Sequence, residues 1–299
     1  MKKKNKKSAI ITIVLVVFLL VGLSVMLYPT FSDWYNIGRF KTDIANYDKK
    51  VSTTKKDDIA KMFKEAEDYN EKIKKLASPL TDYDKVPNYD KILDISGTGI
   101  MGYINIPKIK MEIPIYHGTS SDVLNVAAGH LEGTTLPIGG KGNHAVISAH
   151  RGLVSSKLFT DIDKLREGDY FSITVLNRVM YYEVDQIKIV LPDNVTDLYP
   201  VRGSDFVTLM TCTPYGINTH RLLVRGHRIK NPEGGSTMNV TSDAVQVDPM
   251  VVIPYIAIPL LILLIVYWHS ESKREKRYRH TALEKYNKSK NNPKNRGGP

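Results

Sequence analysis

Two long uncharged stretches stand near the ends of the chain, and the residues between them follow shorter periods. Ala9 to Tyr28 contains twenty residues without a charge. At a rise of about 1.5 Å per residue this is enough to cross a hydrocarbon core of roughly 30 Å. Met250 to Trp268 is a second uncharged run. Its two prolines are tolerated better in a membrane helix than in a soluble one. The pattern predicts a transmembrane helix at each end, over residues 9–28 and 249–268.

Each apolar run has a second interpretation. The first follows MKKKNKK, which also fits the start of a cleaved secretory signal. However, it exceeds the usual stretch of about 7–15 apolar residues, and no small-residue cleavage site follows it. The second run could form a buried core helix, but a dense basic segment, SKREKRYR, follows almost directly. We therefore favour two uncleaved membrane anchors.

The basic composition first suggests a nucleic-acid binder, since 42 Lys plus Arg face 31 Asp plus Glu, for a net charge of +11. The two ends, residues 1–7 and 269–299, together hold +12, which leaves the remainder at about −1. By the positive-inside rule the basic tails, 1–8 and 269–299, are cytoplasmic and residues 29–248 are extracellular. We therefore expect a two-pass protein of the cell membrane that binds no nucleic acid.

The region after the first span is helical in its pattern. Apolar residues recur at helical spacing between about Lys55 and Leu76. The following segment, Ala77 to Gly99, has turn formers and aromatic residues but little periodicity. It is expected to be a loop, long enough to suggest a function. Together these segments make a helical stalk over residues 29–99. The residues of the helical stripe are Ile59, Met62, Phe63, Ala66, Tyr69, Ile73 and Leu76.

From residue 100 onwards the pattern changes to short β-forming runs separated by Gly and Pro, which indicates strands. Seven or eight short strands favour a sandwich or a closed barrel, so we expect a mainly β domain over residues 100–230. One short helix is expected at Asp122 to Ala128. A linker rich in Gly, Ser and Thr, residues 231–248, leads to the second span. The expected strands are 101–106, 111–115, 144–149, 170–175, 179–188, 206–211 and 221–228.

The single cysteine is the first candidate for chemistry. One Cys excludes a disulfide within the chain and a zinc cluster built on cysteines. Cys212 ends the apolar run VTLMTC and precedes the turn-rich TPYGINTHR, which places it at a strand end beside a loop. A thiol needs cationic neighbours to reach the thiolate range, and His220, Arg221 and Arg225 follow. The local pattern leaves both a nucleophile and a buried, inert Cys open.

A cysteine nucleophile also needs a proton-transfer partner and a group that stabilises the oxyanion. His144 and His150 lie at the two ends of the strand predicted within the segment HAVISAHRG. Because they are six residues apart, an even number, both are expected on one side of that strand. His150 stands at the strand end, the more natural place for a site, so His144 is expected to be structural. Arg221 begins a strand nine residues after Cys212. A single connection would place it on an antiparallel neighbour of the strand that carries Cys212, with its guanidinium near the thiol.

These residues lie in segments that resemble the sortases. TLMTC, residues 208–212, matches their TLxTC signature, and the similarity to class C, the pilus-assembling sortases of Gram-positive bacteria, runs from about Gly102 to Arg228. The two flanking apolar runs also fit the class C layout. The matching segments are GYINIPKI, IPIYHGTSSDVLNVAAGHLEGTTLPIGG, HAVISAHRG, LFTDIDKL and TLMTCTPYGINTHRLLVRGHR.

The resemblance implies a cysteine transpeptidase built on a closed eight-stranded β barrel with short helices. Cys212 would be the nucleophile, His150 the general acid and base, and Arg221 the cation that steadies the substrate and the oxyanion. The thiolate would attack the Thr carbonyl of an LPXTG-like sorting signal, and a pilin Lys amine would resolve the thioacyl enzyme. The implied partners are pilins with such C-terminal signals, and no metal or other cofactor is implied.

One departure concerns the lid that class C sortases usually carry over the site. Its Asp-Pro-aromatic motif places the Asp on the active-site Arg and the aromatic ring over the Cys. Here the corresponding residues read Ser78, Pro79 and Leu80, without the charge and the ring. We expect a lid that is weakly held or absent, and an ectodomain that reacts without an activation step.

Two other functions remain open. A housekeeping sortase would transfer its substrate to a cell-wall precursor amine, but the C-terminal span argues against it, because such enzymes commonly have only the N-terminal anchor. A binding module with a degenerate site is the alternative from another class. It is disfavoured because Cys212, His150 and Arg221 are all present.

Overall fold

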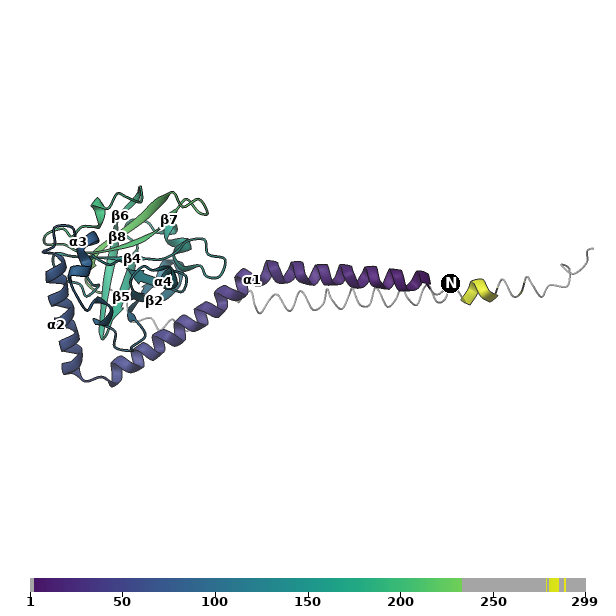
Figure 1. The fold of residues 1–299 in the computed structure, drawn as a ribbon, viewed down its shortest axis with the longest axis horizontal. Helices are drawn as coiled ribbons and strands as arrows, with labels where there is room; N and C mark the ends of the chain where they lie inside the picture. The colour runs from purple at the N-terminus through teal and green to yellow at the C-terminus, as the bar shows by residue number, and fades with distance from the viewer. Residues whose placement is uncertain (1–2, 233–277, 279, 285–287, 289–299) are drawn as a thin grey trace, which may run out of the picture. The chain divides into compact units, whose positions relative to one another are not determined.

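The computed structural model describes residues 3–232, 278, 280–284 and 288. The chain divides into two compact units, residues 1–239 and 240–299. The second expected span, Met250 to Trp268, and nearly all of the expected linker lie outside the described residues. The helices and strands that follow all belong to the first unit (Figure 1).

Helix α1, Lys3–Thr53, contains the first apolar run and continues well beyond it. Among the described residues, α1 is the one helix long and apolar enough to cross a membrane. Its C-terminal part packs on the barrel through side chains spaced three or four residues apart, which form one helical face. Tyr47 joins this packing by its hydroxyl, which donates to Met101 O at 3.0 Å and accepts from Leu176 N at 2.7 Å. The buried residues of the face are Phe40, Ile44, Tyr47 and Val51.

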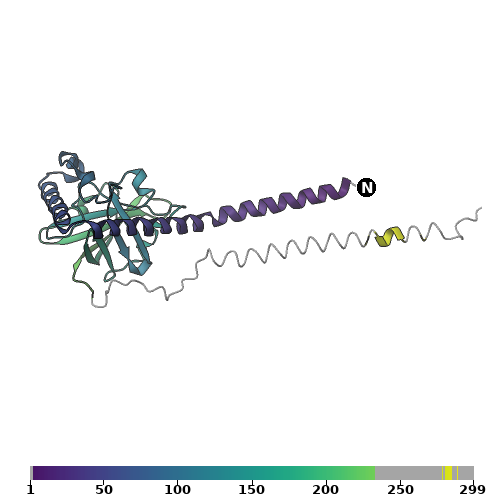
Figure 2. The same ribbon diagram turned by 90° about the horizontal axis from the view of Figure 1, so that it is seen from below.

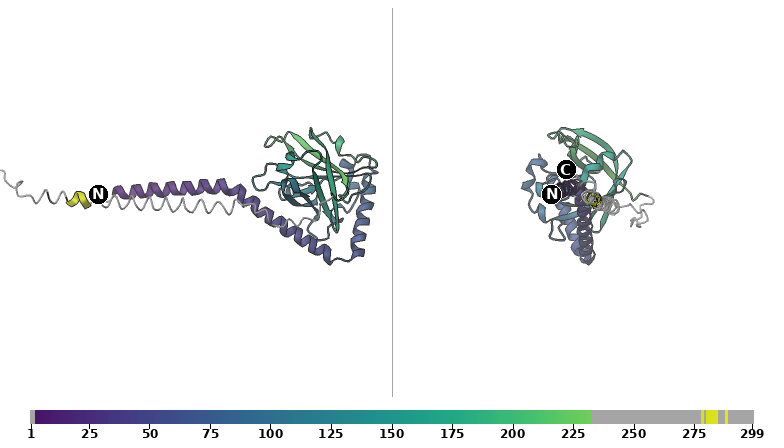
Figure 3. Two further views of the ribbon diagram at one scale, coloured as in Figure 1. Left: turned by 180° about the vertical axis from the view of Figure 1, so that it is seen from behind. Right: turned by 90° about the vertical axis from the view of Figure 1, so that its right-hand side faces the viewer.

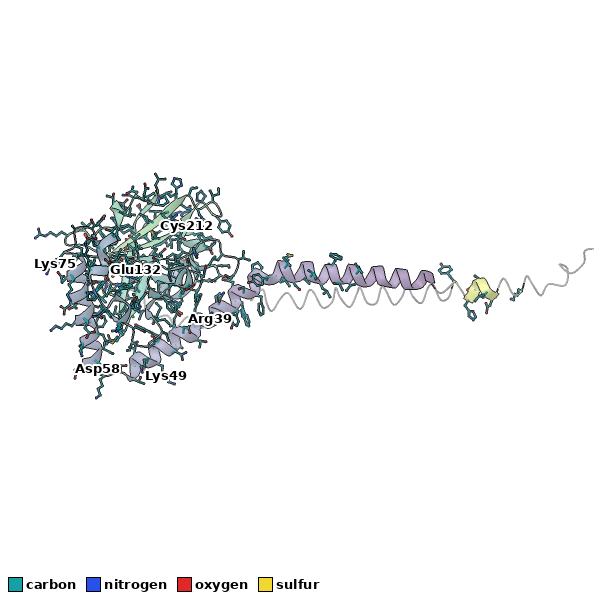
Figure 4. All side chains as sticks on the ribbon, in the orientation of Figure 1. Arg39, Lys49, Asp58, Lys75, Glu132 and Cys212 are labelled. Atoms are coloured by element: carbon teal, nitrogen blue, oxygen red, sulfur yellow. The ribbon has the colours of Figure 1, made fainter. Side chains whose placement is uncertain are left out.

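Helix α2, Lys56–Ile73, corresponds to the expected stalk helix. Its buried residues follow the predicted stripe and pack on the barrel. Asn70 strengthens the contact, because its amide donates to Leu136 O at 3.2 Å and accepts from Leu136 N at 2.6 Å. Figure 2 shows α1 running alongside the barrel. Figure 4 marks Lys49 near the end of α1 and Asp58 near the start of α2, where the chain turns.

Residues 77–99, expected to be a loop, contain three short helical turns. These are α3 (Pro79–Asp82), η1 (Tyr83–Lys85) and η2 (Tyr89–Lys91). Each has only three or four residues, which is too short for a helical periodicity to show in the sequence. Further short 3-10 turns interrupt the β domain: η3 (Pro107–Ile109), η4 (Leu158–Lys164) and η5 (Thr196–Leu198).

Eight strands close into a barrel in the order β1-β2-β3-β4-β7-β8-β6-β5 (Figure 3). The mainly β, closed eight-stranded architecture is thereby confirmed. Most neighbouring pairs are antiparallel, whereas β2 with β3 and β4 with β7 are parallel. The strands are β1 (Ile100–Ile106), β2 (Met111–His117), β3 (Ala128–His130), β4 (Asn143–Ser148), β5 (Tyr170–Val175), β6 (Arg178–Val190), β7 (Asp205–Thr213) and β8 (His220–Ile229).

The pattern of the sequence found seven of these strands and missed β3. The expected helix Asp122–Ala128 is shorter, because α4 spans only Ser121–Leu124, and Ala128 begins β3 instead. Strand β3 has three residues, all buried, and one of them is Gly. Its conformation depends on pairing with β2 and β4, a tertiary effect that no local period reveals.

Candidate active site

Two of the three residues proposed for catalysis, Cys212 and Arg221, stand on adjacent strands, and His150 follows the end of a third strand beside them. Strand β7 lies between β4, which is parallel to it, and β8, which is antiparallel. Cys212 on β7 pairs directly with Arg221 on β8. On the other side, Ser148 pairs with Met210, so His150 follows two residues after Ser148, as Cys212 follows two after Met210. The topology therefore brings His150 and Arg221 to either side of Cys212.

Cys212 and Arg221 share one face of the sheet. Met210 and Leu223 form part of a small apolar cluster separate from the main barrel core. Because side chains alternate along a strand, positions two residues away point to the same side. Cys212 is two residues from Met210, and Arg221 is two from Leu223, so both are placed on the outer face of the barrel.

Cys212 is a free, partly exposed thiol near the C-terminal end of β7, and Figure 4 labels it on the barrel. Its backbone neighbourhood is firmly joined to the end of β4. The hydroxyl of Thr211 donates to Ala149 O at 2.8 Å, and Ala149 N donates to Met210 O at 3.2 Å. These bonds continue the β4–β7 pairing as far as the residue before His150. A thiol held at a strand end in this way is open to a substrate.

Arg221 is held by the loop that connects β7 to β8. Its Nη1 donates to Asn218 O at 3.3 Å and to His220 O at 3.1 Å. Asn218 has a φ of 62°, a left-handed conformation that Asn tolerates better than most residues. The guanidinium thus has a fixed anchor, and it carries its charge at any physiological pH.

Arg151, the residue after His150, is a member of the site that the sequence reasoning did not assign. Its side chain is only 10% exposed and forms an ion pair with Asp163 at 2.5 Å. Its Nη1 also donates to Thr213 Oγ1 at 3.4 Å, and the guanidinium lies 5.9 Å from the centre of the Tyr215 ring. Its Nε is buried without a hydrogen-bond partner. Arg151 therefore links the end of β4 to η4 and to the residue after Cys212.

A sequence signal for Arg151 exists, but it is indirect. The motifs HAVISAHRG and LFTDIDKL each contain one member of the pair with Asp163. Neither motif alone indicates that an Arg beside the candidate His is buried. Only the fold shows that these two segments meet.

His144 lies near the start of β4 and is built into the protein interior. Its Nε2 lies 2.7 Å from Thr208 Oγ1, and its Nδ1 lies 3.0 Å from Tyr199 O. Burial lowers the pKa of His144 below its ordinary value, which favours a neutral ring. Both ring nitrogens are engaged, so the expected structural role agrees with its position.

The expected lid residues pack against Gly133, in the connection between β3 and β4. Pro79 is buried, and a Cβ on Gly133 would overlap the Pro79 carbonyl oxygen. Gly133 itself has a φ of +83°, so the close approach and the backbone both require glycine there. Within the described residues, no hydrogen bond or ion pair joins positions 78–80 to Cys212 or Arg221.

Tyr89 anchors the rest of the 77–99 segment to the barrel. Its hydroxyl accepts from Gly118 N at 2.9 Å and lies 2.9 Å from Nδ1 of His130. Its ring meets that of His117 edge-on, with 5.2 Å between the ring centres. The segment is therefore firmly packed, in contrast to the weakly held lid expected from positions 78–80. The apolar side chains Val86, Ile92 and Leu93 of this segment are buried as well.

The arrangement as a whole is suited to nucleophilic catalysis. Cys212 stands on a strand that pairs it with Arg221 on one side and with the end of β4, which leads to His150, on the other. An imidazole can serve as a proton-transfer group, and a guanidinium as a cation for developing negative charge. In the part of the chain that the structure describes, no group of three or more His, Cys, Asp or Glu side chains is placed to hold a metal ion.

Comparison with known proteins gives consistent matches. Residues 104–229 match the sortase domain family. The crystal structure of sortase C1 from Streptococcus agalactiae is 47% identical, with a TM-score of 0.58, and the match covers 64% of this chain and 99% of that one. Sortase C-1 from Streptococcus pneumoniae is 45% identical, with a TM-score of 0.57, covering 63% of this chain and 98% of that one.

A curated relative is matched over a shorter region. Sortase A of Streptococcus agalactiae serotype III (strain NEM316) is 29% identical over 137 residues, which are 45% of this chain. The match spans 55% of that relative's length, less than two thirds.

Proposed function

Because this chain belongs to the sortase family, we propose that it is a membrane-anchored cysteine transpeptidase of class C, which assembles pili. The observation that carries the proposal is the pairing of Cys212 with Arg221 across β7 and β8, beside the end of β4 that leads to His150. The similarity to sortase C1 supports the class. The reaction, substrates and partners below are part of the same proposal.

In the first half of the reaction, the Cys212 thiolate attacks the Thr carbonyl carbon of an LPXTG-like sorting signal. The carbonyl oxygen becomes an oxyanion, which the Arg221 guanidinium stabilises. Collapse of this intermediate breaks the Thr–Gly bond, and His150 gives a proton to the leaving Gly amine. The acyl group remains on Cys212 as a thioester.

In the second half, a Lys amine of a pilin attacks the thioester carbonyl. His150 takes the proton from the attacking nitrogen, and Cys212 leaves as a thiolate. The product is an isopeptide bond between two pilin subunits. A thioester keeps the acyl group activated for this transfer, provided that the amine reaches it faster than water does.

The location follows from the helix at the N-terminus. Helix α1 is long and apolar enough to anchor the chain in a membrane. We assign both basic tails to the cytoplasm and the barrel to the extracellular face, with a second span over residues 249–268. The charge distribution of the sequence supports this two-pass topology.

A reconstituted polymerisation assay tests the function. The full-length chain in detergent or vesicles is incubated with a purified pilin that carries an LPXTG-like signal, and the products are resolved under denaturing conditions. We expect a ladder of covalent oligomers, together with a thioacyl adduct on Cys212 detectable by mass spectrometry. Both are lost in Cys212→Ala and retained in Lys141→Ala, which changes an exposed residue before β4.

Two outcomes would favour the alternatives. Cleavage of the signal with transfer only to a small cell-wall amine, and no oligomers with any pilin, would indicate a housekeeping sortase. Binding of the signal peptide without thioacyl formation would indicate a non-catalytic module.

A further inference from the structure

The loop that follows His150 is tied to the membrane-anchoring helix. Residues 151–157 form the part of the β4–η4 connection that comes after His150. Asn36 on α1 donates its side-chain amide to Ser155 O at 2.8 Å, and Lys157 N donates to Asp33 Oδ1 at 2.9 Å. The Lys157 ammonium also lies 3.9 Å from Asp33 Oδ2. Asp33 and Asn36, about one helical turn apart on α1, thus hold the loop that follows His150.

These contacts bring the loop close to the expected edge of the membrane. Asp33 stands five residues beyond Tyr28, the last residue of the expected span, and is the first charged residue after it. At a rise of about 1.5 Å per residue, this places Asp33 about 7.5 Å along the helix from that edge. The polar headgroup region on each side of a bilayer is roughly 5–8 Å thick. A tilt of α1 would lower the loop further, so residues 155–157 lie at the level of the headgroups.

The loop and its neighbour present exposed apolar side chains at this end of the barrel. Val154 is 61% exposed, and in the β7–β8 loop Tyr215 is 59% and Ile217 is 68% exposed. We call these three residues the loop face. The two loops touch, because a Cβ on Gly152 would lie 3.2 Å from the Tyr215 ring. The loop face therefore lies between the loop contact with α1 and the end of β7 that carries Cys212.

Helix α1 carries matching side chains just past the expected span 9–28. Phe31, Trp34 and Tyr35 are all exposed within the protein. Trp and Tyr are enriched at membrane interfaces, where an apolar ring with a polar tip is favoured. These aromatic residues lie around Asp33 and Asn36, the turn of α1 that holds residues 155–157. The expected lipid contact of α1 therefore extends up to this turn.

We propose that the loop face rests on the outer surface of the membrane that α1 spans, with Val154, Tyr215 and Ile217 in the headgroup region. The active-site end of the barrel then faces the bilayer, and Cys212 works at the membrane surface. This inference rests on the proposed anchoring of the chain by α1. The lipid interface is the partner of the loop face, because the loop face is continuous with the helix that anchors the chain.

A single fluorescent probe tests this arrangement in the full-length chain. Since Cys212 is the only cysteine, Val154→Cys in a Cys212→Ala background gives one site for an environment-sensitive dye. The labelled protein is reconstituted into vesicles of phosphatidylcholine and phosphatidylglycerol, with and without a lipid that carries a quencher near the headgroup. We expect a blue-shifted emission that the quencher lipid reduces.

Lys141→Cys in the same background is the matched control, because Lys141 is exposed before the first residue of β4, at the opposite end of that strand. Its dye should stay in water and remain unquenched. Adding Asp33→Ala and Asn36→Ala to the Val154→Cys protein should weaken the quenching, since both bonds to the loop are removed. Equal, low quenching at positions 154 and 141 would overturn the inference.

Two measurements separate this inference from the proposals on which it rests. Flotation of the vesicles reports whether the chain is anchored, and pilin polymerisation by the protein with Cys212 intact reports whether it is a transpeptidase. Anchored, active protein whose position 154 is not quenched would refute the membrane contact alone. A dye response to a sorting-signal peptide in detergent, without a response to vesicles, would assign the loop face to the peptide and would also refute it.

Discussion

Cys212 and Arg221 stand directly opposite each other on the antiparallel strands β7 and β8, and the Arg221 guanidinium is bonded to two carbonyl oxygens of the loop between them. The short connection between β7 and β8 keeps the two residues close in the chain. The strand pairing places both side chains on the same face of the sheet. A cation held by backbone carbonyls does not have to be ordered when negative charge develops beside the thiol. This preorganisation is the property that electrostatic catalysis requires.

Replacing Arg221 should affect catalysis more than the formation of the fold. We expect Arg221→Ala to lower kcat by about 10²–10³-fold, the usual effect of removing an oxyanion donor. Arg221→Lys should recover only part of this loss, because an ammonium keeps the charge but lacks the planar fork that meets two carbonyls and a substrate. Steady-state cleavage of a sorting-signal peptide measures both variants. Full activity in Arg221→Ala would exclude the proposed role.

Arg151 should act by positioning its neighbour His150. Arg151→Ala removes the ion pair with Asp163, whose own side chain is 42% exposed, and the contact with Thr213. A hydrogen bond to a charged group contributes about 1.5–3 kcal/mol, so the free energy of unfolding should fall by about that amount. We also expect kcat to fall more than KM changes, with an altered pH profile, since the loop after His150 loses its support.

The control for Arg151 is Lys157→Ala in the same loop, whose side chain is 72% exposed. Surface ion pairs contribute about 0–1 kcal/mol, so this variant should unfold nearly as the wild type does. Urea unfolding and peptide kinetics are compared for both. A loss of stability in Arg151→Ala with an unchanged pH profile of kcat would show that Arg151 is only structural.

The sequence was informative where periodicity and local pairing determine the structure. Strand β5 was found with its observed bounds. The antiparallel pairing of Cys212 with Arg221 also followed from their spacing of nine residues. Each of these features belongs to a single strand or a hairpin, so residues close together in the sequence are enough to predict it.

The parts that could not be predicted depend on segments distant in the chain. Strand β3 exists only between two partners, and Arg151 becomes buried only because η4 packs beside it. The packing of residues 77–99 depends on Tyr89, whose partners His130 and Gly118 come from the barrel. No local pattern reports such contacts.

The anchoring of Tyr89 leads to a prediction about access to the thiol. Tyr89→Phe removes the contacts of its hydroxyl with Gly118 and His130, which should lower the free energy of unfolding by about 1 kcal/mol. It should leave the rate of Cys212 alkylation unchanged, because positions 78–80 make no polar contact with the thiol among the described residues. Slow alkylation in the wild type that accelerates on deletion of residues 77–90 would instead indicate a closed lid.

His130 should make the stability of the protein depend on pH. Its side chain is fully buried, and burial lowers its pKa from 6.5 to about 4. Between these values the unfolded chain binds a proton that the folded protein excludes, so stability is complete above about pH 6.5 and falls as the pH drops towards 4. A difference of this size corresponds to roughly 3 kcal/mol. His144, whose pKa is also lowered by burial, acts in the same direction.

Comparison with His130→Gln isolates this contribution from the rest. The variant should be less stable at pH 7, because Gln cannot reproduce both the contact of the ring with Tyr89 and that of Nε2 with Thr135 O at 2.9 Å. It should, however, lose less stability than the wild type between pH 7 and pH 4.5, since one group that must remain neutral is gone. Urea unfolding midpoints at the two pH values measure the difference. Parallel losses in both proteins would show that His130 is not the group that titrates, and would transfer the pH dependence to His144.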